Sequence, residues 1–189
     1  MKMNYLFDDL LKQAAINEFI TGGQSIVLND LNMLAKRLNL SITIIGGVAV
    51  QMYKYARFTG DVDILMKTAD ASSLAHALIE LGYEDIGENK FRHVSGFEVN
   101  ICADSVYAGQ GLKFDSPTAL PGTIDVVSLQ KLLATKIESN RSKDRGDFVE
   151  LVKINDIPLQ TIQSDVIPLI RTKLGKIAAI QLWNKAQRE

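Results

Sequence analysis

The sequence predicts an α/β (α+β) fold in which helices flank a small mixed β-sheet and a helical part follows at the C-terminus. Apolar residues recur at helical spacing near the N-terminus, over residues 70–81 and through most of the chain after residue 128. Short β-branched segments such as 41–45 lie between those helical patterns. Alternation of the two patterns is typical of helices that pack on a sheet.

Each element is predicted from its local pattern. Strands are expected where short apolar, β-branched runs are bounded by turn-forming residues, at 41–45, 61–65, 90–94, 97–103 and 123–127. Helices are expected at two N-terminal segments separated by Gly22 and Gly23, and at 48–56, 70–81, 128–140 and most of the chain after Asp144. The strands at 90–94 and 97–103 are expected to form a hairpin through Ser95 and Gly96. We expect a core of residues 1–127, with residues 128–189 as a helical part packed on it.

The composition is that of one compact domain, or of one domain with a small appendage. The chain has 189 residues and 47% of them are hydrophobic, which is enough for a sizeable core. Its 21 basic and 22 acidic side chains nearly cancel, so the totals favour neither a nucleic acid nor an anionic membrane as a partner. The single cysteine, Cys102, excludes an internal disulfide and any site that needs a cysteine pair.

The cellular location is predicted from the N-terminal segment and the cysteine content. Asp8 and Asp9 interrupt the apolar residues of the N-terminal segment, so it lacks the continuous hydrophobic stretch of a signal peptide. No window reaches the roughly 18 consecutive apolar residues of a membrane-spanning helix. We therefore expect a soluble protein in a reducing, cytoplasmic compartment, with no membrane partner.

Two aspartates stand in the predicted strand "DVDIL". Asp61 and Asp63 are two residues apart, so their side chains project from the same face of the strand, about 7 Å apart along the backbone. Aspartate is depleted in strands, and two like charges side by side repel each other unless a cation lies between them. Carboxylate oxygens are the ligands of Mg²⁺ or Mn²⁺, and Mg²⁺ completes its shell with waters and substrate phosphates. The pair therefore predicts a site for a metal ion that carries a phosphate.

Two glycines precede these aspartates at a strand-to-helix junction. Gly46 and Gly47 have no side chains, so a phosphate can approach the backbone N–H groups and the positive end of the helix dipole. A simpler interpretation stays open, in which the glycines form a tight turn and the aspartates face solvent. The combination of the glycine pair, a helix, Arg57, Thr59 and the paired carboxylates within eighteen residues favours the ligand site.

The segment "GGVAVQMYKYARFTGDVDI" resembles the signature of the nucleotidyltransferase superfamily, in which Gly-Gly, a helix and "R-x-T-x-D-x-D" occur in this order. The later run "KLLATKIESNRSKDRGDFVEL" is also similar to the stand-alone bacterial nucleotidyltransferases of the abortive-infection toxin type. The resemblance implies a small mixed sheet with flanking helices. It also implies transfer of a nucleoside monophosphate from a nucleoside triphosphate to an acceptor hydroxyl, with Mg²⁺ or Mn²⁺ as the cofactor. Two alternatives stay open: a nucleotide- or partner-binding protein of this fold with lost or weak activity, and a toxin held by an antitoxin partner. The acceptor stays open between RNA, protein and a small molecule.

The resemblance also suggests roles for single residues. Asp61 and Asp63 would bind the metal and take part in catalysis, and Gly46 and Gly47 would contact phosphate. Arg57 and Thr59 match positions of the motif next to the nucleotide, although Arg57 is equally well explained as a structural partner of an aspartate.

The third carboxylate of the family pattern is irregular in this chain. The strand "GFEVNICAD" has Asn100 at the best-aligned position, and an amide cannot accept a proton at neutral pH. Glu98 lies two residues earlier on the same face and is predicted to replace the missing acid, with Asp104 as a more distant candidate. This departure bears on turnover more than on fold or nucleotide binding.

Basic residues near the second motif have two interpretations. Lys143 and Asp147 are four residues apart, the spacing of a surface ion pair on a helix. The alternative is that Lys143, Lys136 or Arg141 contacts the triphosphate. His76 and His93 are seventeen residues apart and show no ligand spacing. Cys102 is expected to be a small buried hydrophobe, and Trp183 a packing anchor.

Overall fold

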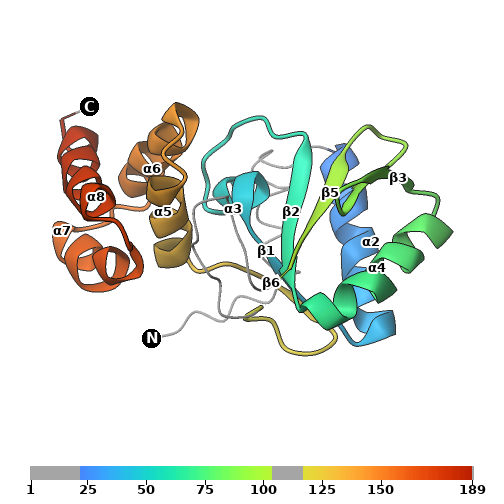
Figure 1. Cartoon of the computed structure of the whole chain (residues 1–189). Coiled ribbons are helices and arrows are strands. Elements are labelled where there is room, and N and C mark those ends of the chain that lie inside the picture. The colour runs from blue at the N-terminus through green and yellow to red at the C-terminus, as the bar shows by residue number, and fades with distance from the viewer. Residues whose placement is uncertain (1–21, 104–116, 189) are drawn as a thin grey trace.

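The computed structural model describes residues 22–103 and 117–188 of the chain. Six strands form one mixed sheet with the order β3-β4-β5-β2-β1-β6 (Figure 1). The predicted α/β class, with a small mixed sheet, flanking helices and a helical C-terminal part, is confirmed. The first predicted helix and Asp104 lie outside the described residues.

The strands are short and the helices alternate with them along the chain. The strands are β1 Ser41–Ile44, β2 Asp61–Met66, β3 Glu84–Gly87, β4 Lys90–Arg92, β5 Glu98–Ala103 and β6 Thr123–Val126. The helices are α2 Gly22–Leu38, α3 Gly46–Met52, α4 Thr68–Glu80, α5 Leu129–Glu138, α6 Ser142–Ile154, α7 Leu159–Thr161 and α8 Lys173–Ala186. A π-helical turn, Ile162–Val166, and a 3-10 turn, Ile167–Leu169, join α7 to the segment before α8.

The central strands have two different faces because side chains alternate along a strand. β2 is parallel to β5 and antiparallel to β1, and β1 is parallel to β6. One face carries the fully buried Val62 and Ile64 of β2 together with Val99 of β5. Helices α2 and α4 lie along the sheet (Figure 1), and the buried face of α2 contains Leu28 and Leu31. The opposite face carries the polar residues of β2 and β5.

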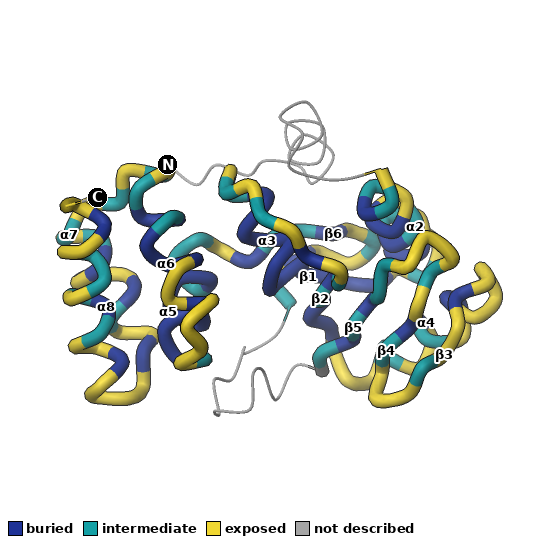
Figure 2. The backbone as a smooth tube through the Cα atoms, turned by 90° about the horizontal axis from the view of Figure 1, so that it is seen from above, coloured by how far each residue is buried: buried dark blue, intermediate teal, exposed yellow. Residues whose placement is uncertain are grey.

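The C-terminal helices α5, α6, α7 and α8 gather at one end of the molecule, beside the sheet (Figure 1). Buried residues continue from β1, β2 and α3 into α5 and α6 (Figure 2). The buried apolar residues of both parts belong to a single cluster that includes Phe148 and Leu133. The division into residues 1–127 and 128–189 stays a prediction, although the loop between β6 and α5 coincides with that boundary.

Several elements differ from the sequence prediction. Strand β3 was not expected, because Glu84–Gly87 is a polar edge segment that pairs only with β4. Gly22 and Gly23 both lie within helix α2, whereas a break between helices was predicted there. Helix α3 begins at Gly46 and ends at Met52, earlier at both ends than predicted. Among the described residues, no helix has both the length and the apolar character needed to cross a membrane.

Candidate active site

Strands β2 and β5 bring three polar side chains together on one face of the sheet. The two strands are parallel, with Asp61 opposite Glu98 and Asp63 opposite Asn100. Because neighbouring strands are about 4.8 Å apart, side chains at paired positions on one face lie within contact distance. The Asn100 amide nitrogen donates to Asp63 Oδ1 at 2.9 Å and to Asp61 Oδ2 at 3.5 Å. Asp61 also accepts a hydrogen bond of 2.5 Å from the Thr59 hydroxyl.

These carboxylates repel each other in a half-buried site. Burial, and then the neighbouring charge of Asp61, raises the pKa of Asp63 above its usual range. The hydrogen bond from Asn100 and the more remote charges of Lys136 and Arg141 oppose that rise. Because the pKa of Asp63 is raised on balance, the hydrogen bonds and positive charges around its carboxylate do not fully compensate the negative charge.

Gly46 and Gly47 lie directly against the aspartate-bearing strand. Gly46 has φ +64°, and a Cβ at this position would collide with the Asp63 carboxylate. A Cβ on Gly47 would lie 2.5 Å from the Thr59 hydroxyl oxygen and 3.0 Å from the Arg57 guanidinium. The glycines therefore leave room for the carboxylate and for the side chains that orient it. This steric role was not foreseen from the sequence, and the predicted contact with phosphate stays a prediction.

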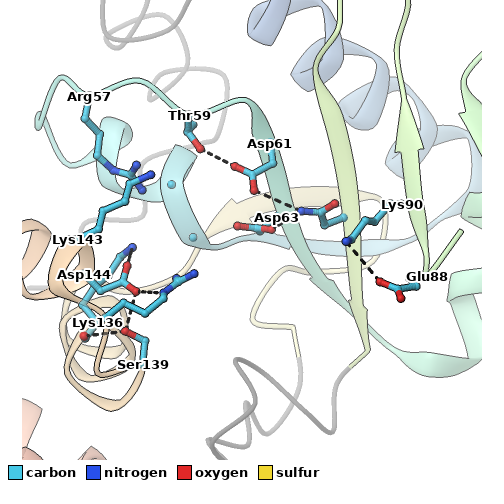
Figure 3. Close-up of a pocket in the computed structure, with 14 residues that line it drawn as sticks. Arg57, Thr59, Asp61, Asp63, Glu88, Lys90, Lys136, Ser139, Lys143 and Asp144 are labelled. Atoms are coloured by element: carbon cyan, nitrogen blue, oxygen red, sulfur yellow. Dashed lines mark hydrogen bonds and ion pairs between the residues drawn. The ribbon is translucent and has the colours of Figure 1, made fainter. Parts of the chain in front are cut away.

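A cavity of about 860 Å³ opens beside this face (Figure 3). Asp61, Asp63 and Asn100 line it from the sheet, and the two glycines line it from α3. The cations that line it are Arg57, Lys90, Lys136, Arg141 and Lys143. Lys136, Arg141 and Lys143 come from the helical C-terminal part, so the cavity lies between that part and the sheet. Its volume is in the range of small-molecule sites.

A network of ion pairs with two buried aspartates holds the cavity's Lys136, Arg57 and Arg141 in place. Lys136 Nζ lies 2.6 Å from Asp144 Oδ1 and 2.8 Å from Asp147 Oδ2. Arg57 Nε lies 3.2 Å from the other oxygen of Asp147, which connects the loop before β2 to α6. Arg141 Nε lies 2.5 Å from Asp144 Oδ2. Less than a tenth of each of the Lys136, Asp144 and Asp147 side chains is exposed, so each charge depends on its partners.

The network also accounts for the titration of Asp144. Burial by itself would raise the pKa of this carboxyl. Hydrogen bonds from Lys136, Ser139 and Arg141, together with the charge of Lys136, lower the pKa below its usual range. The carboxylate of Asp144 is therefore stabilised in its charged form.

The network corrects one sequence interpretation. Asp147 does not form a surface pair with Lys143, because it is buried against Arg57 and Lys136. Lys143 is exposed and lines the cavity. Sequence spacing pointed to the local partner, whereas Arg57 reaches Asp147 from another part of the chain. The roles of Asp144 and Asp147 were missed, and their only sequence signal was two acids on what is otherwise a buried helix face.

The polar groups between β2 and β5 suit a divalent cation. Asp61 and Asp63 lie on the same face of β2, and the charge of the Asp63 carboxylate is incompletely compensated. The buried amide oxygen of Asn100 has no hydrogen-bond partner among the described residues. All three side chains offer oxygen, which is the ligand type that Mg²⁺ and Mn²⁺ prefer. Within 22–103 and 117–188, no three His, Cys, Asp or Glu side chains are grouped closely enough to hold a metal ion. A cation here would therefore rely on Asp61, Asp63 and an uncharged neighbour.

Glu98 does not join the two aspartates in such a group. Its carboxylate accepts hydrogen bonds from Arg92, at 3.1 Å from Nε and 2.9 Å from Nη2. It lines a smaller cavity of about 450 Å³ next to the first, together with Asp61 and Lys143. The structure therefore does not support Glu98 as the third carboxylate of a metal site, because Arg92 on the neighbouring strand β4 pairs with it. Asn100 occupies the position beside the aspartates.

The two histidines, the cysteine and the tryptophan of the chain make packing and hydrogen-bond contacts outside the lining of the cavity. The ring of His76 contacts the Ser72 backbone oxygen at 2.8 Å on the exposed side of α4, and His93 packs near Tyr83 with ring centroids 5.0 Å apart. Burial raises the pKa of Cys102 to about 11, so it is not a reactive thiolate. Trp183 packs against the core and donates its indole N–H to the Ile157 carbonyl at 2.8 Å, which agrees with its predicted packing role.

Comparison with known proteins gives only distant likeness to solved structures. No protein-family model matches the chain, and no curated protein matches it. Among solved structures, the chain is similar to the solution structure of the antibiotic-resistance factor ANT(2'')-Ia, with a TM-score of 0.44 and 16% sequence identity. The match covers 89% of this chain and 94% of that chain. Because the likeness is so distant, the properties of that factor do not extend to this chain.

Proposed function

We propose that this protein is a metal-dependent nucleotidyltransferase that moves a nucleoside monophosphate from a nucleoside triphosphate to an acceptor hydroxyl. The observation that carries the proposal is the cavity with Asp61 and Asp63 on the sheet side and cations on the helical side. The negative charges of a triphosphate would be attracted to the cations on the helical side, and its metal ion would bind the aspartates. Such a division of charge suits phosphoryl-group chemistry, in which positioning and charge stabilisation supply most of the catalysis.

Each residue of the site has a role in this proposal. Asp61 and Asp63 hold the divalent ion, which when bound supplies positive charge to the phosphate oxygens that become more negative during transfer. Thr59 orients Asp61 through its hydrogen bond of 2.5 Å. Lys136 and Arg57 line the cavity and are held in place by buried acids, so they are already positioned for phosphate oxygens.

The more exposed cations of the cavity complete the proposed triphosphate site. Lys143 lies on an exposed part of α6, and the Arg141 side chain is 70% exposed, so both can reach toward a phosphate. Gly46 and Gly47 present backbone without side chains at the same cavity. In the transfer itself, the acceptor hydroxyl gives up its proton to solvent and its oxygen forms a bond to the α-phosphorus. The bond from the α-phosphorus to the oxygen that bridges to the β-phosphorus breaks, and pyrophosphate leaves with that oxygen and its electron pair.

A second candidate function is nucleotide binding with weak or lost turnover. Asn100 favours it, because the side chain beside the two aspartates is an amide and cannot accept the proton of the acceptor hydroxyl. The acceptor itself stays open between RNA, protein and a small molecule. The antitoxin partner and the cytoplasmic location stay predictions.

Nucleotide binding and transfer are tested together with a double variant, Asp61→Asn with Asp63→Asn. We expect the wild type to bind Mg²⁺-nucleoside triphosphate more tightly than the metal-free nucleotide, and the double variant to lose that difference because its amides carry no charge. Titration calorimetry with and without Mg²⁺ measures both affinities. The matched control is Asp70→Asn with Glu80→Gln on α4, which removes the same charge away from the cavity.

Transfer is measured with labelled nucleoside triphosphates and pools of RNA, protein and metabolites in Mg²⁺ or Mn²⁺. Metal-dependent labelling of one pool by the wild type but not by the double variant would support the enzyme. Metal-dependent nucleotide binding without labelling of any pool would favour the second candidate. Equal Mg²⁺-nucleotide affinity in the wild type and the double variant would overturn the metal assignment of the two aspartates.

A further inference from the structure

The Asn100 amide has one satisfied end and one unsatisfied end. Its nitrogen contacts both aspartate carboxylates, at 2.9 Å and 3.5 Å. Its oxygen is buried and has no hydrogen-bond partner in the part of the chain that the structure describes. A buried polar atom left without a partner destabilises the folded protein, because the hydrogen bond that it made to water in the unfolded chain is lost. This side chain therefore gives up one interaction in order to place N–H groups against the carboxylates.

The orientation of this amide depends on what lies between the carboxylates. The two ends of an amide have nearly the same shape, so turning it over exchanges a donor for an acceptor with little change in packing. With no cation between Asp61 and Asp63, the N–H end reduces their mutual repulsion. With a cation there, the same N–H end would point at positive charge and the oxygen end would become favourable.

We propose that Asn100 is a ligand of the divalent cation, and that its amide turns over on binding so that Oδ1 joins the carboxylates of Asp61 and Asp63. The proposal rests on the proposed function, because it takes the aspartate pair to be a cation site. Asn100 is directly opposite Asp63 on the parallel strand β5 and already touches both carboxylates, so the exchange needs no movement of the backbone. The resulting ligand set consists of oxygen alone, as suits Mg²⁺ or Mn²⁺.

A neutral third ligand changes the charge of the site. Two carboxylates and one amide carry one negative charge fewer than three carboxylates, so the cation is held less tightly before the nucleotide arrives. The alternative role for Asn100 is that of a neutral spacer, which only separates the two aspartates and never contacts the ion. The ligand and the spacer predict different effects when this one side chain is changed.

The test is Mn²⁺ binding without nucleotide, measured from the electron paramagnetic resonance signal of free Mn²⁺. If Asn100 is a ligand, Asn100→Leu should weaken Mn²⁺ binding by about 10-fold or more, because an oxygen ligand is replaced by an apolar group of similar size. Asn100→Asp should strengthen it by about 10-fold, because the third ligand becomes charged. The matched control is Glu98→Gln, which removes a charge two residues away that is already paired with Arg92 and should change the affinity little.

A second readout follows the amide itself. In nuclear magnetic resonance spectra, the side-chain NH₂ signals of Asn100, identified by their loss in Asn100→Asp, should shift during a Mg²⁺ titration of the wild type. The same titration of the Asp61→Asn, Asp63→Asn double variant should leave them unchanged. This measurement does not depend on whether Asn100→Leu folds.

Two outcomes would overturn the proposal while the proposed function stands. One is equal Mn²⁺ affinity in the wild type and in a folded Asn100→Leu. The other is Mn²⁺ affinity in Asn100→Asp that is no higher than in the wild type. If instead the wild type and the aspartate double variant bind Mn²⁺ equally, the pair is not a cation site, and both proposals fail.

Discussion

The aspartate pair of β2 and the aspartate pair of α6 differ in how their negative charges are compensated. Asp144 and Asp147 are almost fully buried, and each lies within ion-pair distance of Lys136 and of an arginine. Asp61 and Asp63 are half-buried, and their side-chain hydrogen bonds come from the neutral groups of Thr59 and Asn100. The pKa of Asp144 is lowered, whereas the pKa of Asp63 is raised.

The difference shows which acids belong to the folded framework and which have unused binding capacity. An acid pair that is already neutralised by internal cations has little affinity left for an external cation. A pair that repels itself gains from one, and it faces a cavity that can admit one. The predictions below change one pair at a time.

The largest expected effect is that of Asp147→Asn. The change leaves the buried Lys136 and Arg57 without a charged partner at this position, so the free energy of unfolding should fall by about 3–5 kcal/mol. Denaturant unfolding measures it. The control is Glu150→Gln on the same helix, which breaks a more exposed pair with Lys153 and should cost no more than about 1 kcal/mol. Similar losses in both variants would show that the buried network is not what distinguishes Asp147.

Gly46→Ala tests how closely the Asp63 carboxylate fits its surroundings. The added Cβ occupies the space of that carboxylate, and φ +64° is unfavourable for alanine, so the free energy of unfolding should fall by about 2 kcal/mol or more. The control is Gly146→Ala in α6, where a Cβ meets nothing within 4 Å. It should stabilise the protein by about 0.5–1 kcal/mol, because alanine is a better helix former than glycine. Thermal and denaturant unfolding of both variants measure the contrast, and an unchanged Gly46→Ala protein would contradict the close packing.

Asp63→Asn should stabilise the protein in the absence of divalent cations. The amide removes a carboxylate whose charged form is disfavoured by burial and by Asp61, so the free energy of unfolding should rise. Denaturant unfolding in the presence of a chelator measures it. The sign is opposite to that expected for Asp147→Asn. A loss of stability in both variants would mean that the two acid pairs are compensated alike.

The smallest effects are in the pH dependence of stability, where Asp63 and Asp144 contribute over different pH ranges. The folded-state pKa of Asp63 is raised, so the stabilising effect of Asp63→Asn should shrink as the pH falls from that raised value to 3.8, the ordinary value of an aspartate. The folded-state pKa of Asp144 is lowered, so its contribution is fully present above 3.8 and is lost as the pH falls below that value.

Denaturant unfolding of the wild type, Asp63→Asn and Asp144→Asn across the acid range measures these windows. The difference between the wild type and Asp144→Asn should stay constant above 3.8 and shrink below it. Loss of both differences over one and the same pH range would contradict the opposite pKa shifts.

The parts of the fold that were predicted correctly depend on local pattern. β-branched runs indicated β1, β2 and β6, and helical spacing with a capping serine indicated α5, where Ser128 accepts a hydrogen bond from the Lys131 amide. Strand β3 was missed because it is polar and pairs only at the edge of the sheet. The π-helical and 3-10 turns before α8 were missed because packing, not residue type, decides such irregular turns.

In the candidate site, too, the sequence determined the local features and the tertiary structure decided the contacts between distant residues. The sequence alone determined that Asp61 and Asp63 share one face of a strand and that Gly46 and Gly47 leave a side-chain-free junction beside it, because strand alternation and glycine geometry are local properties. Only the tertiary structure decided that Asn100 and not Glu98 touches the aspartates, because the strand register and the Arg92 partner of Glu98 come from pairing between strands. It also decided that Arg57, Lys136 and Asp147 meet, because residues far apart in sequence come into contact only when α5 and α6 pack beside the sheet and exclude water from their charges.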